Sequence, residues 1–107
     1  MKYDTCPDKW VIIKLPDCYK VFGTWIGGYL DGDAWRVNSG IAEVQEDEKY
    51  FYFHGHSGSI YRCHKNSYGT NTYTQGVLDL MFRKAKEQSD VEIETLNKDF
   101  DFINLLK

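Results

Sequence analysis

The sequence lacks the features that mark a membrane or secreted protein. Its apolar runs are only a few residues long, too short to cross a bilayer. The first ten residues, MKYDTCPDKW, contain no apolar signal region. Its three cysteines (Cys6, Cys18 and Cys63) are an odd number without a C-x-x-C pair, whereas a secreted disulfide framework normally has an even number. We therefore expect free thiols in a reducing compartment and a soluble, cytoplasmic protein.

The sequence also lacks a strong charge of either sign. A net charge of −3 is too acidic for a general nucleic-acid binder, which is usually basic, and too weak for a DNA mimic. The charge is unevenly distributed along the chain, with −4 over residues 1–48, +4 over residues 49–88 and −3 over residues 89–107. The only positive third of the chain contains all three histidines.

Aromatic residues, in contrast, are abundant, at 16% of the 107 residues. This length indicates one domain, residues 1–107. Short runs rich in aromatic and β-branched residues alternate with turn signals, a pattern typical of an antiparallel meander. The runs are Trp10–Leu15, Tyr19–Ile26, Ala34–Asn38, Ile41–Gln45, Lys49–His54 and Ile60–Lys65.

A helix is expected over about residues 73–88, where the apolar period changes to 3.6 residues. Thr72 and Gln75 have the spacing of a capping box at its start. Val91 and Ile93 alternate with acidic residues as in an edge strand, and residues 98–107 form a short closing element. The predicted fold class is α+β: an antiparallel meander of about five or six strands with one main helix packed on one face and a short C-terminal element.

The stretch FYFHGHSGSIYRCHKNSYG, residues 51–69, holds every histidine and predicts a β-hairpin. A loop of residues 57–59, with Gly58 in a left-handed conformation, pairs His56 with Ile60 and His54 with Arg62. The apolar side of this hairpin carries Phe51, Phe53, Tyr61 and Cys63. The other side carries Tyr50, Tyr52, His54, His56, Ile60, Arg62 and His64. A two-residue turn at 57–58 is the alternative register, but it mixes core and charged residues on each face.

The polar loop that follows the hairpin is a candidate phosphate site because it leads to a helix N-terminus, where free backbone N–H groups favour anions. It is not a P-loop, since it lacks G-x-x-x-x-G-K-[ST]. Besides Arg62, its candidate residues are Lys65, Ser67, Tyr68, Thr70 and Thr72.

The sequence gives less support for a metal site or a catalytic site than for a phosphate site. His54 and His56 share a strand face, as two zinc ligands could, but Cys63 points to the other side of the hairpin. Cys63 and His64 point apart, so Cys63 is expected in the core rather than as a nucleophile. The chain contains no G-x-S-x-G elbow. We therefore expect no catalytic residue, metal or cofactor.

The leading hypothesis is a small non-enzymatic binding protein that inhibits or modulates a macromolecular partner, most simply a protein. It rests on composition: compact, acidic, aromatic-rich domains are common among immunity proteins and phage anti-defence proteins. The contact surface would combine the histidine-bearing hairpin face with the acidic run Glu43, Glu46, Asp47 and Glu48. One alternative is a binder of a nucleotide or other phosphorylated small molecule through residues 62–74, and another is a small histidine-dependent enzyme. No membrane contact is expected, and both a monomer and a homodimer are open.

Overall fold

The computed structural model describes residues 1–28 and 32–107 and shows an α+β fold, as predicted. All six expected strands and the main helix form within two residues of their predicted bounds. The elements are β1 (Lys9–Lys14), β2 (Tyr19–Gly28), β3 (Gly32–Val37), β4 (Ile41–Glu46), β5 (Tyr50–Gly55), β6 (Ile60–His64), α1 (Thr72–Ser89), β7 (Glu94–Thr95) and the 3₁₀ helix η1 (Phe102–Asn104).

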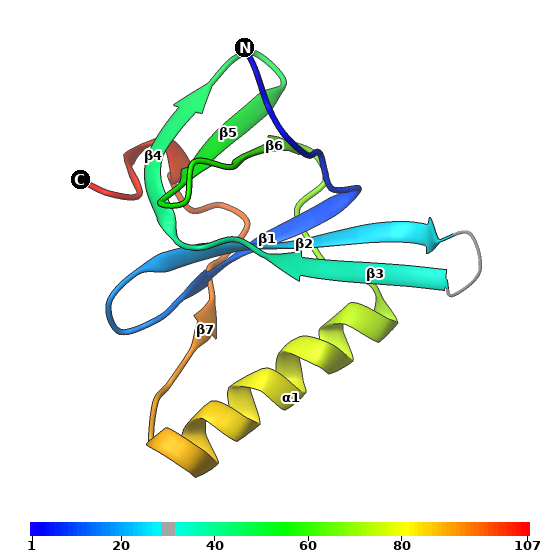
Figure 1. Ribbon diagram of the computed structural model, residues 1–107, viewed down its shortest axis with the longest axis vertical. Coiled ribbons are helices and arrows are strands. Elements are labelled where there is room, and N and C mark those ends of the chain that lie inside the picture. The colour runs from blue at the N-terminus through cyan, green and yellow to red at the C-terminus, as the bar shows by residue number, and fades with distance from the viewer. Residues whose placement is uncertain (29–31) are drawn as a thin grey trace.

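The strands form two antiparallel sheets rather than one continuous meander. The large sheet has the order β3-β2-β1-β7, and the small sheet has the order β4-β5-β6. Figure 1 shows three layers, with the small sheet above, the large sheet in the middle and α1 below. The chain passes from one sheet to the other between β3 and β4. Gly40 lies in this connection with φ +124°, a conformation that favours glycine.

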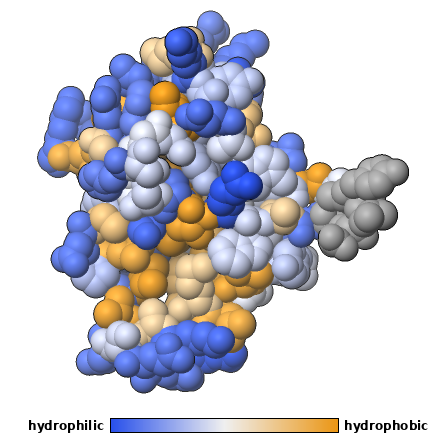
Figure 2. Space-filling view, viewed as in Figure 1, coloured by the Kyte–Doolittle hydropathy of each residue, from blue (hydrophilic) through white to orange (hydrophobic). Residues whose placement is uncertain are grey.

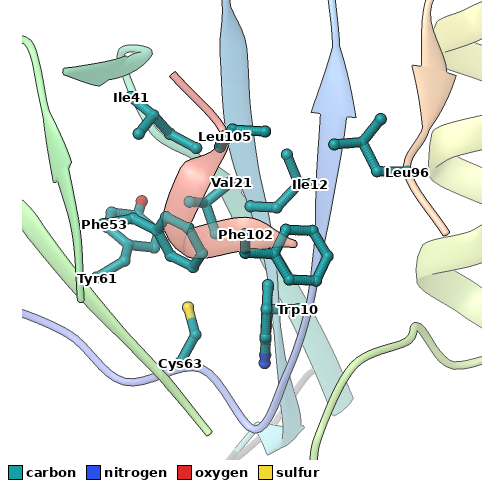
Figure 3. Packing of buried hydrophobic residues seen from close by; sticks show 10 residues of the cluster. All are labelled: Trp10, Ile12, Val21, Ile41, Phe53, Tyr61, Cys63, Leu96, Phe102 and Leu105. Carbon is teal, nitrogen blue, oxygen red and sulfur yellow. The ribbon is translucent and has the colours of Figure 1, made fainter. Parts of the chain in front are cut away.

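The space between the two sheets holds the larger hydrophobic core. Trp10 is 1% exposed, and its ring contacts Phe51, Phe53, Tyr68 and Phe102 with centroids 4.7–5.9 Å apart. Figure 3 shows Trp10 and Phe53 beside Phe102 of η1, which closes this core near the C-terminal end of the chain. Cys63 is fully buried here, as the sequence predicted.

A second core lies between the large sheet and α1. Val11, Ile13 and Phe22 point toward the helix and pack against Leu78, with Val77, Met81 and Phe82 around them. Because β1 is covered on both faces, it is apolar almost throughout instead of alternating. The predicted apolar stripe of the helix therefore packs on one face of a sheet, as expected.

Helix α1 is capped one residue earlier than predicted. Asn71, not Thr72, is the N-cap, and its Oδ1 accepts from the backbone N of Thr74 at 2.8 Å. The Thr74 hydroxyl accepts in turn from the backbone N of Asn71. Thr74 is fully buried and also accepts from the Thr24 hydroxyl at 3.0 Å, which fixes the helix to β2. The tertiary contact thus selects Thr74 over Gln75 as the capping partner.

The hairpin pairs two residues out of the predicted register. His54 pairs with Ile60 and Tyr52 with Arg62, because Gly55 closes a wider turn by donating to the carbonyl of Ser59 at 2.8 Å. A shift of two residues preserves both faces. Gly58 has φ +98°, as predicted.

Two further predictions differ from the structure. His56 lies beyond the end of β5, so its inclusion on the strand face was wrong. The strand expected around Val91 and Ile93 is reduced to β7, Glu94–Thr95, which pairs with Ile13 and Lys14.

Candidate functional site

The outward face of the small sheet gathers most of the predicted binding residues. Strand alternation directs this face away from the core, because the opposite side chains, including Phe53 and Cys63, are buried. Figure 2 shows mainly blue and white side chains over this upper part of the molecule, whereas orange side chains lie lower, nearer α1. We call this surface the tyrosine–arginine face, defined by Tyr3, Tyr50, Tyr52, His54, Arg62 and His64.

The centre of the tyrosine–arginine face is a guanidinium held between two aromatic rings. The Arg62 guanidinium carbon lies 3.9 Å from the ring centroid of Tyr3 and 4.2 Å from that of Tyr50. Cation–π contacts of this kind are each worth about 0.5–1 kcal/mol at exposed sites. The side chain of Cys6 also approaches the guanidinium and raises the pKa of Arg62. Arg62 is therefore cationic and fixed in one position.

Tyr3 reaches this position because the N-terminal segment adds to the edge of the small sheet. The backbone N of Asp4 donates to the carbonyl of Ile60, and the backbone N of Arg62 donates to that of Thr5, both at 2.9 Å. Thr5 forms a parallel bridge with Tyr61. Sequence reasoning missed Tyr3, because no local pattern signals pairing with a strand more than fifty residues away.

The Arg62 side chain is not fully satisfied by the protein. Its Nε is buried and has no hydrogen-bond partner among residues 1–28 and 32–107. A buried donor without an acceptor costs about 1–3 kcal/mol. Residues that break such a local rule are expected mainly at functional sites. Arg62 therefore places one unsatisfied donor at the centre of this face, although Cys6 and Tyr52 also contact its guanidinium.

Tyr52 is the buried member of the tyrosine–arginine face. It is only 3% exposed, and its hydroxyl donates to Asp47 at 2.6 Å. This bond lowers the pKa of Asp47 and raises the pKa of Tyr52. Asp47 also accepts from the backbone N of Lys49 and of Tyr50, so its carboxylate holds the β4–β5 turn. Of the acidic run, Asp47 therefore stabilises the fold through these hydrogen bonds.

The three histidines do not form one cluster. His54 is bonded to Gln45 at 2.8 Å, and the Nδ1 of His64 accepts from the backbone N of Asn66 at 3.0 Å. His56 lies against Gly40, where an added Cβ would meet its ring at 2.9 Å. In the part of the chain that the structure describes, no three His, Cys, Asp or Glu residues are grouped as metal ligands.

The candidate residues after β6 are occupied by structural contacts. Lys65 forms an ion pair with Glu46 at 2.6 Å, and Ser67 accepts from the Trp10 backbone N through its carbonyl. The Tyr68 hydroxyl donates to the carbonyl of Leu96 at 2.6 Å, and burial raises the pKa of Tyr68 to about 12. Tyr68 is therefore not a free stacking surface.

The helix start lies apart from Arg62. Thr70 donates to Gln75 at 2.6 Å, and Thr72 is exposed at the first turn. The amide of Asn71 donates to Asp33, which places a carboxylate beside the helix N-terminus. Arg62 belongs to β6 of the small sheet. Helix α1 packs on the far side of the large sheet (Figure 1). The two parts of the predicted phosphate site are thus not brought together.

Comparisons with known proteins add no constraint on this face. No protein-family model matches the chain, and no curated protein or solved structure matches it. Among the described residues, no helix is long and apolar enough to span a membrane.

Proposed function

We propose that this chain is a non-enzymatic binding protein that inhibits or modulates a protein partner through the tyrosine–arginine face. The observation that carries the proposal is the Arg62 guanidinium, stacked between Tyr3 and Tyr50 with its buried Nε unpartnered. Tyrosine and arginine are enriched among the residues that dominate the energy of protein interfaces. Their rigid placement reduces the entropy lost on binding.

The partner's contact is expected to be acidic at its centre. A stacked guanidinium recognises carboxylates through the N–H groups in its plane, and Arg62 is partly exposed. The rim of the face has the opposite sign: Glu43 and Glu48 are exposed, while Glu46 and Asp47 already have protein partners. A complementary partner would thus place an acidic residue against Arg62 and basic residues around it.

The phosphate-binding alternative has less support. It needs Arg62 and the start of α1 in one site, and these lie on different layers. The Asp33 carboxylate beside Asn71 also repels an added anion at the helix start. The enzyme alternative lacks an acid–base pair: in the described parts of the chain, no histidine forms an ion pair with a carboxylate.

Quantitative affinity purification from the native host cells tests the proposal. Wild type is compared with Arg62→Ala and with Arg83→Ala, a matched variant of an exposed arginine on α1. A hot-spot truncation costs about 2 kcal/mol or more, roughly thirtyfold in affinity. We expect a protein that is retained by wild type and Arg83→Ala but lost with Arg62→Ala.

A second pair of variants, Tyr3→Ala and Tyr73→Ala, keeps the test valid if Arg62→Ala does not fold. Tyr3 is 44% exposed and Tyr73, on α1, is 55% exposed, so alanine at either position leaves the cores intact. Tyr3→Ala should lose the partner and Tyr73→Ala should keep it. Equal recovery of every protein by all four variants would refute the proposal. Tyr52 is unsuitable for this test, because its truncation would also destabilise the sheet.

A further inference from the structure

Three of the edges of the two sheets are short, covered or acidic. β7 has only two residues, Glu94–Thr95, and the edge of β6 is occupied by the N-terminal segment, where Thr5 accepts from the backbone N of Arg62. β4 carries the exposed side chains of Glu43 and Glu46. Natural proteins protect sheet edges in these ways, because an unpaired edge can recruit another strand. The remaining edge is β3, which has six residues and contains neither proline nor lysine.

The backbone of β3 directs hydrogen-bonding groups outward from this edge. The backbone N of Asn38 donates to the carbonyl of Val21 at 3.1 Å, which makes these two residues a hydrogen-bonded pair. Hydrogen-bonded and non-hydrogen-bonded pairs alternate along an antiparallel ladder. Val37 and Trp35 therefore lie in pairs whose N–H and C=O groups point away from β2. Within residues 1–28 and 32–107, these groups of Trp35 and Val37 have no hydrogen-bond partner.

The side chains of β3 leave the edge open. Trp35 stacks on Phe22 with ring centroids 5.5 Å apart, yet 40% of Trp35 is exposed. The Arg36 guanidinium carbon lies 5.7 Å from the ring centroid of Trp25, so this charge is directed back over β2. The carboxylate of Asp33 accepts from a backbone N of β2 at 2.9 Å. Both charged side chains of β3 thus contact their own chain instead of protecting the edge.

A second copy of the chain is complementary to this edge. When two β3 strands run antiparallel about a two-fold axis at Trp35, the outward N–H and C=O of one Trp35 meet those of the other. The two exposed rings then form a cross-strand aromatic pair, which is favourable. Asp33 lies opposite Val37, and Ala34 lies opposite Arg36. Moving the axis to Arg36 would instead place two like charges opposite each other, which is unfavourable.

We propose that two copies of this chain associate through β3 into one continuous antiparallel sheet, with Trp35 at the two-fold axis. The tyrosine–arginine face belongs to the small sheet, so this association does not depend on the partner binding proposed above.

Sedimentation equilibrium of the full chain tests the association. We expect a monomer–dimer equilibrium between about 10 μM and about 1 mM. Trp35→Lys places two ammonium groups at the axis and should raise the Kd roughly tenfold or more. The matched control is Leu80→Lys, at a residue 42% exposed on α1, and it should leave the Kd unchanged. A chain that stays monomeric throughout this range, or a Kd that is equal in wild type and Trp35→Lys, would overturn the proposal.

Hydrogen–deuterium exchange of the wild-type chain at residue resolution locates the interface even if Trp35→Lys does not fold. The backbone amides of Trp35 and Val37 should exchange roughly tenfold more slowly at the high concentration than at the low one, because they are bonded only in the dimer. The amides of Ala34 and Arg36 face β2 already and should change much less. Slowing confined to other amides, with none at Trp35, would show that the copies associate elsewhere and would refute the β3 interface.

Discussion

Replacing Tyr68 by phenylalanine removes one hydroxyl that connects two distant backbone groups. The hydroxyl accepts from the backbone N of Ile12 at 3.1 Å and donates to the carbonyl of Leu96 at 2.6 Å. Ile12 is fully buried and Leu96 is 8% exposed, so water does not readily replace the lost partner. Each unsatisfied buried group costs about 1–3 kcal/mol. With two such groups, we expect Tyr68→Phe to lower the free energy of unfolding by about 2–6 kcal/mol.

Equilibrium unfolding in urea measures this difference. The control is Tyr73→Phe, because Tyr73 is 55% exposed on α1 and its substitution should change stability by less than about 0.5 kcal/mol. The slope of the transition should be the same for both variants. A change below about 0.5 kcal/mol for Tyr68→Phe would refute the structural role assigned to this hydroxyl and return Tyr68 to the candidate ligand-binding residues.

Three further predictions concern capping, pH dependence and the core. Asn71→Ala should cost about 1 kcal/mol in urea unfolding and Thr72→Ala much less; the reverse order would restore Thr72 as the cap. The pKa of Asp47 is lowered, mainly by the bond from Tyr52, so this bond stabilises the fold above about pH 4 and is lost as the pH falls through the folded-state pKa. The stability difference between wild type and Tyr52→Phe should therefore narrow in acid, and a constant difference would contradict the assignment. Cys63→Ser should lower stability by about 1–3 kcal/mol, because it places a hydroxyl in an apolar core, and unaltered stability would argue against that environment.

Much of the fold could be predicted because its signals are local. The strands follow from runs of aromatic and β-branched residues between turns, and α1 follows from the spacing of Val77, Leu78, Met81 and Phe82. The division of the strands into two sheets could not be predicted in this way. It depends on the connection at Gly40 and on a Trp10 side chain that contacts segments from across the whole chain.

The candidate site was predictable in part. Alternation along the hairpin correctly separated Arg62 and His64 from the buried Cys63, even though the register was shifted by two residues. The turn width, which removes His56 from the strand, depends on a bond between Gly55 and Ser59 that no sequence motif specifies. Tyr3 was missed for the same reason, since its contact with Arg62 is entirely non-local.

The central claim is that the tyrosine–arginine face binds a protein partner. Hydroxyl-radical footprinting of the complex recovered with wild-type chain tests it most directly, because it reads tyrosine exposure residue by residue. Tyr3, now 44% exposed, and the partly exposed Tyr50 should be protected in the complex. Tyr73, 55% exposed on the far layer, should be oxidised equally with and without the partner. Protection of Tyr73 with no change at Tyr3 and Tyr50 would contradict the account.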